Sequence, residues 1–128
     1  MKTKPMLLFC LIAGLLAGPA GAAPAAEPQK GDAALCTKLL DSIRNADFAA
    51  FIADGSPEFQ AITKGDFLSM AAQLSPRFKA GITVTYFGEL RQQGYRMTLW
   101  KIVFSDGGDD ALVTLSVKDG KVGGFFIH

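Results

Sequence analysis

The chain contains one histidine, His128, which is its last residue. An imidazole has the intrinsic pKa that acid–base catalysis near neutral pH requires. Asp109 and Asp110 are expected close to His128 across the last pair of predicted strands, and a carboxylate can orient an imidazole for proton transfer. However, strand ends fray, and the sequence offers neither a nucleophile nor a matched second acid. We therefore interpret His128 as the end of a strand and keep catalysis as the alternative.

Glu89 and Arg96 flank the segment "RQQG" and form a second candidate pair. If "RQQG" is a four-residue loop, Glu89 faces Arg96 across a hairpin. A three-residue loop with Gly94 in the left-handed conformation would remove the pair. We favour an ordinary cross-strand ion pair, which contributes little to stability when exposed. The alternative is a buried charged pair at the mouth of a pocket, with Glu89 as a base.

The sequence lacks the common signatures of metal, nucleotide and hydrolase sites. It contains no C-x-x-C, H-E-x-x-H, P-loop, G-x-G-x-x-G or G-x-S-x-G motif. Asp106, Asp109 and Asp110 could offer oxygen ligands to calcium, but this short segment is more typical of a hairpin turn. We therefore expect neither a metal nor a cofactor.

The N-terminal residues have the composition of a secretory signal peptide. Lys2 and Lys4 precede the apolar run 6–17, and small residues in an A-x-A arrangement follow at 20–22. The apolar run is shorter than the roughly 20 residues that span a membrane. We expect a signal peptide at 1–22, a flexible leader at 23–31 and a single domain at 32–128, secreted or periplasmic and not held in a membrane after cleavage.

Cleavage leaves a nearly neutral chain with 11 Lys and Arg against 12 Asp and Glu. Without a basic cluster, the chain lacks the electrostatic pattern that nucleic-acid binding requires. Cys10 leaves with the signal peptide, so no internal disulfide can form. Cys36 shares a helical stripe with Leu35, Leu39, Leu40 and Ile43, which predicts that its thiol is buried.

Helices are predicted in the first half of the domain. Asp32 is a candidate N-cap for a helix, and Asp47 for a short continuation over "FAAFIA". The segment 54–57 has the composition of a turn. Thr63 and Asp66 resemble a capping box before a second helical region, in which Ser75-Pro76 is expected to restart or end the helix and Gly81 to close the region.

Four strands are predicted after residue 81, over 82–90, 95–104, 111–118 and 121–128, because these runs are β-branched and aromatic and are separated by short turns. The expected fold is α+β, with the helices packed on one face of a curved four-stranded antiparallel meander. A two-residue turn at Asp119-Gly120 pairs Lys118 with Lys121. Continued without interruption, this register places Phe126 on the face covered by the helices and His128 at the rim of that face.

The second strand is apolar on both faces. One face carries Met97, Leu99 and Val103, and the other carries Trp100, Ile102 and Phe104. Helices can cover only one side of a single sheet, so the other side must either curve around a pocket or pack on a second copy. We therefore expect a homodimer through the sheet.

The segments "NADFAAFIADGSPEF", "LSPRFKAG" and "LWKIVFSDGGDDALVTLSVKDGKVGGFFI" resemble small secreted members of the nuclear transport factor two-like superfamily, which have a cystatin-like α+β cone. The resemblance covers about residues 32–128. It implies a pocket between sheet and helices, and dimers that often form through the sheet. Enzymes of this fold often use a carboxylate with a histidine or tyrosine inside the cone. The candidates here for such a pocket are Tyr86, Glu89, Arg96, Trp100 and His128.

We predict an exported, non-enzymatic binding or interaction domain with an apolar pocket for a small ligand, or with a protein partner. Tyr86 and Trp100 could line that pocket, but such aromatics are more often core or dimer contacts. The alternative is a small cofactor-independent enzyme of the isomerase or dehydratase type. In it, His128 or Glu89 would act as the base and Tyr86 or Arg96 would polarise the substrate.

Overall fold

The computed structural model describes residues 27–128. The predicted signal peptide and the first four residues of the predicted leader lie outside the described residues. Within the described part, Gln29 accepts a hydrogen bond from the backbone N–H of Asp32 through its carbonyl oxygen. No helix in residues 27–128 combines the length and the apolar character needed to cross a membrane.

The first half of the domain contains four helices: α2 (Asp32–Arg44), α3 (Phe48–Ile52), α4 (Pro57–Gln60) and α5 (Lys64–Ala80). The predicted caps at Asp47 and Thr63 are confirmed, since their side chains accept the backbone N–H of Ala50 and Asp66. The predicted cap at Asp32 is wrong. Gly31 takes the N-cap position with a φ of 93°, and Asp32 is the first helical residue.

Helix α5 does not restart or end at Ser75-Pro76, so that prediction is also wrong. The helix continues through Pro76 to Ala80 and closes at Gly81, as expected. A proline inside a helix removes one backbone hydrogen bond. The last turn nevertheless carries Phe78, which is 1% exposed, and burial of a phenylalanine offsets part of that loss.

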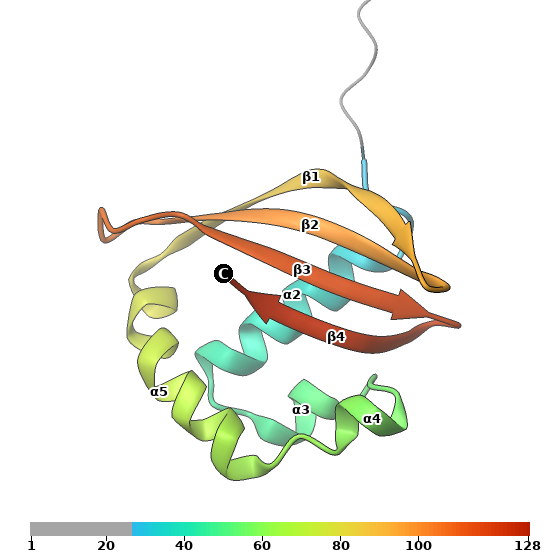
Figure 1. The fold of residues 1–128 in the computed structure, drawn as a ribbon. Helices are drawn as coiled ribbons and strands as arrows, with labels where there is room; N and C mark the ends of the chain where they lie inside the picture. The colour runs from blue at the N-terminus through green and yellow to red at the C-terminus, as the bar shows by residue number, and fades with distance from the viewer. Residues whose placement is uncertain (1–26) are drawn as a thin grey trace, which may run out of the picture.

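The second half of the domain is one antiparallel sheet with strands β1 (Ile82–Gln92), β2 (Tyr95–Phe104), β3 (Ala111–Lys118) and β4 (Lys121–Ile127), in the order β1-β2-β3-β4. The helices lie together on one side of this sheet (Figure 1). The predicted α+β class and four-stranded meander are therefore confirmed. We call the side of the sheet toward the helices the inner face and the opposite side the outer face.

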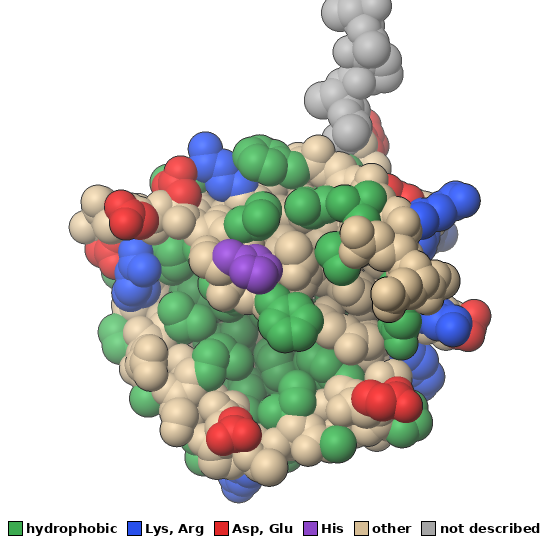
Figure 2. All heavy atoms as spheres, viewed as in Figure 1, with side chains coloured by type: hydrophobic (Ala, Val, Ile, Leu, Met, Phe, Trp, Pro, Cys, Tyr) green, Lys and Arg blue, Asp and Glu red, His purple; other side chains and the backbone are tan. Residues whose placement is uncertain are grey.

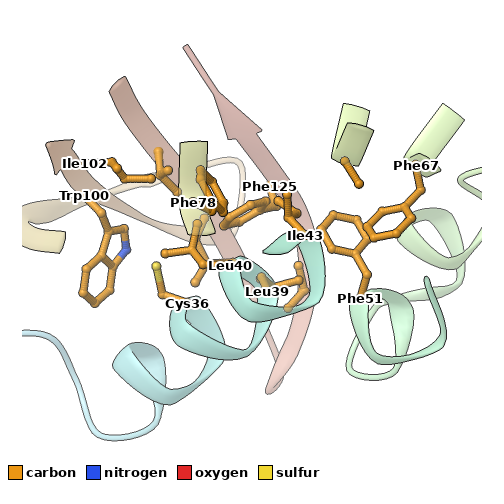
Figure 3. Packing of buried hydrophobic residues seen from close by; sticks show 14 of the residues in the cluster. Cys36, Leu39, Leu40, Ile43, Phe51, Phe67, Phe78, Trp100, Ile102 and Phe125 are labelled. Carbon is orange, nitrogen blue, oxygen red and sulfur yellow. The ribbon is translucent and has the colours of Figure 1, made fainter. Parts of the chain in front are cut away.

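The inner face and the helices enclose a single hydrophobic core (Figure 3). The predicted division of β2 is confirmed, because Trp100, Ile102 and Phe104 are at most 5% exposed whereas Val103 is 38% exposed. Cys36 lies in the core as expected, at 1% exposure. The remaining members of the cluster are aliphatic and phenylalanine side chains: Leu39, Leu40, Ile43, Phe51, Phe59, Phe67, Ala71, Phe78, Val113, Leu115, Val117, Val122 and Phe125.

A β-bulge at Gly123 changes the register of the last hairpin. Lys118 faces Lys121 and Val117 faces Val122 as predicted, but Ser116 then faces Gly124. The extra residue moves every later residue of β4 to the opposite face. Phe125 is therefore buried and Phe126 is 61% exposed. The prediction that Phe126 lies on the covered face is wrong, and the same shift removes His128 from its expected place at the rim.

The bulge at Gly123 also predicts how a small change there affects stability. A Cβ atom on Gly123 would lie 2.4 Å from Cε1 of Tyr95, so Gly123→Ala should destabilise the domain by about 1–3 kcal/mol through overpacking. Nothing lies within 4 Å of a Cβ built on Gly65 in α5, so Gly65→Ala should stabilise the domain by about 0.5 kcal/mol. Urea unfolding measures both. Equal effects of the two changes would contradict this account of the bulge.

Candidate functional site

Tyr86, Glu89, Arg96 and Trp100 lie on the inner face of β1 and β2. Tyr86 faces Trp100 directly, and their ring centroids are 5.0 Å apart in an edge-to-face arrangement. Glu89 faces Thr98, a buried residue between Arg96 and Trp100 on the same face. The structure thus brings four of the five predicted site residues together.

Neither of the two loops considered from the sequence, of four residues or of three, connects β1 and β2. Gln92 pairs with Tyr95, which leaves Gln93 and Gly94 as the turn, both with positive φ (54° and 84°). This conformation is typical of the two-residue turns that match strand twist. Glu89 and Arg96 are therefore not directly opposite, but they share a face and still form an ion pair, with Nη1 of Arg96 3.6 Å from Oε1 of Glu89.

The main partner of Arg96 is Asp32 at the start of α2. Nη1 of Arg96 donates to Oδ2 of Asp32 at 2.6 Å, and Nη2 donates to Oδ1 at 3.0 Å. Asp32 is 2% exposed. This bidentate pair fixes α2 to β2, and the carboxylate also lies in the first helical turn, where negative charge is favourable. The pair was not predicted from the sequence, because its members are 64 positions apart.

The charges around Arg96 form a closed network. The amide of Gln29 donates to both carboxylate oxygens of Glu89 at 3.2 Å. The hydrogen bond to Asp32 raises the pKa of Arg96, against the effect of burial. Burial, followed by the nearby Glu89 and Asp32, raises the pKa of Tyr86, so its hydroxyl stays protonated. The network therefore holds one fixed cation between two carboxylates and beside a neutral phenol.

Trp100 belongs to the core of the domain. It is 5% exposed, and its indole N–H donates to Oγ1 of Thr98 at 2.8 Å. Thr98 in turn donates to the carbonyl of Leu115 at 3.2 Å. Both polar side chains are therefore satisfied inside the domain.

His128 lies on the outer face, apart from the four residues above. Its backbone pairs with Leu112, and its Nε2 atom is 3.5 Å from Oγ1 of Thr114. The imidazole is exposed, so the prediction that His128 lies at the rim of the covered face is wrong. Asp110 borders the same shallow hollow as His128, but its carboxylate pairs with Lys101 at 3.5 Å.

Asp106 holds the loop between β2 and β3 against α5. Its carboxylate accepts Nε of Arg77 at 2.7 Å and the backbone N–H of Gly108 at 2.7 Å, and these two bonds lower its pKa. The guanidinium of Arg77 also stacks 3.7 Å above the ring of Phe104. In the described part of the chain, no group of three or more His, Cys, Asp or Glu side chains is arranged to hold a metal ion.

The outer face carries a group of exposed apolar side chains. Two of them, Phe87 and Phe126, were not predicted from the sequence to be site residues. Phe87 is 60% exposed, because it lies in a second bulge between Tyr86 and Gly88, and Phe126 is 61% exposed. Figure 2 shows hydrophobic side chains around the single histidine on the side that faces the viewer. The bulges that turn these two phenylalanines outward were not predicted from the sequence. Of the predicted outer positions on β2, Leu99 lies between them, and Met97 and Val103 lie further along the strand on either side of Leu99.

Loss of the Arg96 side chain should destabilise the domain, since Asp32 would remain buried without its counter-charge. We expect Arg96→Met to cost about 2–3 kcal/mol, less than breaking a fully buried pair because the Arg96 side chain is 26% exposed. Lys38→Met, which removes a pair between exposed side chains, should cost less than about 1 kcal/mol. Asp32→Leu in the Arg96→Met background should recover part of the loss. If Arg96→Met and Lys38→Met cost the same in urea unfolding, the pair does not fix α2.

The buried thiol of Cys36 should make stability fall in alkaline solution. Burial raises its pKa from 9.0 to about 12, so the folded protein retains a proton that the unfolded chain loses above pH 9. This contribution is fully present below pH 9 and decreases between pH 9 and about 12, by about 1.4 kcal/mol per pH unit. In Cys36→Ala the unfolding free energy should decline less steeply over this range, because the thiol is gone. Other titrations, such as that of Tyr86, contribute equally to both proteins. Parallel curves of unfolding free energy against pH would contradict the prediction.

Comparison with known proteins does not assign this chain to a family. No protein-family model matches it, and no curated protein is similar to it in sequence. The resemblance to the nuclear transport factor two-like superfamily therefore stays a prediction.

Proposed function

We propose that this chain is an exported, non-enzymatic interaction domain that binds a second copy of itself through the outer face of its sheet. The observation that carries the proposal is the exposure of Phe87 and Phe126, at 60% and 61%, on a face that none of the helices in residues 27–128 covers. Exposed apolar patches of this kind are typical of protein interaction sites. The apolar run at 6–17 supports export.

The two phenylalanines flank one row across the outer face. Gly88 faces Leu99, Leu99 faces Thr114, and Thr114 faces Phe126, so these residues lie at the same height on the four strands. Phe87 adjoins Gly88 at one end of the row. The row carries no charge, and a second copy can therefore pack on it without burying an unpaired ion.

Charges at the two ends of β3 favour an antiparallel orientation of the copies. Asp109 and Asp110 precede β3, whereas Lys118 ends it and Lys121 follows the turn. Asp119 leaves a surplus of one positive charge at the turn, and the ion pair of Asp110 with Lys101 leaves Asp109 as the surplus negative charge at the other end. Antiparallel β3 strands would place each basic end near the acidic end of the other copy, and complementary charges fix register more than they add affinity. The uncharged row then lies along the twofold axis.

The area of the outer face suits a dimer that dissociates on dilution. With strands about 4.8 Å apart and a rise of about 3.3 Å per residue, four strands give roughly 500 Å² per copy. Two copies would bury about 1,000 Å², the lower limit of a specific interface. The space between sheet and helices, by contrast, is filled by core side chains such as Phe67 and Phe78, each 1% exposed, so we assign binding to the outer face.

The charged network around Arg96 gives less support to the enzyme alternative. A substrate polarised by Arg96 would have to compete with Asp32, which occupies both terminal guanidinium nitrogens. His128 cannot act with Glu89, Tyr86 or Arg96, because it lies on the other face of the sheet. Only Glu89 remains as a base near Tyr86, and Gln29 already donates to both of its oxygens.

The dimer predicts a change in molecular mass with concentration, measured by light scattering on the protein without residues 1–22. Phe87→Ser should shift the equilibrium toward monomer at least about tenfold, because burial of one phenylalanine contributes about 1.5–3 kcal/mol. Its unfolding free energy should change by less than about 1 kcal/mol, since the side chain is exposed in the monomer. Leu68→Ser on α5 is the matched control, because Leu68 is 39% exposed but does not lie on the sheet.

Single introduced cysteines test the orientation of the two copies by disulfide formation. The native Cys36 does not interfere, because its thiol is buried and protonated. Thr114→Cys should form a disulfide between copies, whereas Lys118→Cys and the control Ser69→Cys on α5 should not. A disulfide at position 118 without one at 114 would contradict the antiparallel arrangement. A monomeric mass at all concentrations would overturn the dimer itself.

A further inference from the structure

The last strand, β4, is an edge strand, and the other described residues cover only its beginning. The N–H of Val122 donates to the carbonyl of Asp54, and the carbonyl of Val122 accepts the N–H of Ser56, both at 2.8 Å. At the other end, His128 exchanges both backbone hydrogen bonds with Leu112 in β3. The backbone groups between Val122 and His128 therefore determine which hydrogen bonds the edge can form with a partner.

Phe125 and Ile127 direct their backbone N–H and C=O groups away from β3. Residues of an antiparallel strand alternate in this direction, and His128 points toward β3, so Ile127 and Phe125 point outward. Within residues 27–128, no other group forms a hydrogen bond with these outward groups. Two neighbouring donor and acceptor pairs are therefore available on the edge, an arrangement that only another extended backbone complements.

A hollow of about 380 Å³ lies beside this edge, between β4 and α5. Its lining is mostly apolar and contains no charged side chain: Met70, Gln73, Leu74, Phe125, Phe126 and Ile127. Figure 2 shows a hollow lined by hydrophobic side chains below the histidine. An added strand would direct alternate side chains to the inner side of the sheet and so into this hollow.

We propose that an extended segment of a partner protein adds to β4 as a fifth strand along Phe125–Ile127 and inserts an apolar side chain into the hollow beside Met70 and Leu74. Main-chain hydrogen bonds supply the affinity in this mode of recognition, and the pocket for alternate side chains supplies the specificity. The site is separate from the dimer face proposed above, although the ring of Phe126 borders both.

The charge around the hollow indicates the chemistry of the segment. Asp66 lies one helical turn before Met70 on the same face of α5, and it gives the rim of the hollow a negative charge. Arg77, one turn after Gln73, is neutralised by its ion pair with Asp106. Lys64 is two residues before Asp66 and so points to a different side of α5. Figure 2 shows acidic side chains on the rim of the hollow opposite the histidine. The segment should therefore be apolar at the positions that enter the hollow and carry Lys or Arg beside them.

A short capped peptide that alternates leucine and threonine between terminal lysines is the probe. Titration followed by NMR should show hydrogen-exchange protection of the Phe125 and Ile127 amides on binding. The same peptide with glutamates in place of the lysines should bind more weakly, and more so at low salt. A version N-methylated on the amides that would face β4 should not bind, because it cannot donate to the edge.

Ile127→Pro tests the edge directly, since it removes an outward N–H without removing a bond to β3. Ile127→Pro should weaken peptide binding by about tenfold or more, because a hydrogen bond to the peptide is lost and the proline ring hinders the approach of its backbone. The control Ile127→Val keeps the N–H and should bind as the wild type does. If Ile127→Pro does not fold, Met70→Lys replaces it as the test variant, because it places a charge in the hollow and also repels the lysines of the peptide. Equal binding by the wild-type and test variants, or no binding of the peptide, would overturn the proposal.

Comparing self-association of the two variants shows whether a partner segment or a second copy of the chain occupies the β4 edge. If Ile127→Pro abolishes self-association while Phe87→Ser does not, the second copy occupies the β4 edge, and both the partner segment and the dimer face proposed above are wrong. If Phe87→Ser abolishes self-association and the peptide still binds, the two sites are independent, as proposed.

Discussion

The four described helices cover only one face of the sheet, and this constraint decides the role of nearly every strand residue (Figure 1). Side chains alternate between the two faces of a strand, so an apolar residue either enters the core or meets solvent. On β2 the inner residues Trp100, Ile102 and Phe104 are buried, whereas Val103 on the outer face is 38% exposed. A chain that places apolar residues on both faces of a one-sided sheet retains an apolar surface after its own core is complete. This remaining surface supports the proposal that the domain binds other chains.

Two β-bulges determine which phenylalanines form that surface. Phe87 lies in the bulge on β1, and Phe126 follows the bulge at Gly123 on β4. Without the second bulge, Phe126 would enter the core and Phe125 would be exposed. Gly123 and Gly124 make the arrangement possible, because the rings of Tyr95 and Phe126 pack where their Cβ atoms would lie. The outer face thus depends on local irregularities of the strands as much as on their apolar composition.

The sequence was sufficient to predict features that depend on neighbouring residues. Strand bounds follow from composition and turn residues, and the caps at Asp47 and Thr63 follow from contacts three residues away. Features set by tertiary packing were not predictable in this way. A Gly-Gly pair permits a bulge but does not require one, so the register was right at the turn and wrong beyond Gly123. The same limit explains why Pro76 was expected to break a helix that the burial of Phe78 maintains.

The network around Arg96 shows why residue type alone is a poor guide to a catalytic site. Arginine, carboxylates and a tyrosine beside a tryptophan can form an acid–base pocket, but they can equally fasten one element to another. Whether such residues can bind a substrate depends on whether their hydrogen-bond donors already have partners. Here both terminal nitrogens of Arg96 bind the carboxylate of Asp32, which is 2% exposed. A ligand at this point would have to displace a buried bidentate pair and leave Asp32 without its counter-charge. A partner on the outer face or along β4 would leave this buried pair in place, so recognition at those surfaces requires the smaller rearrangement of the domain.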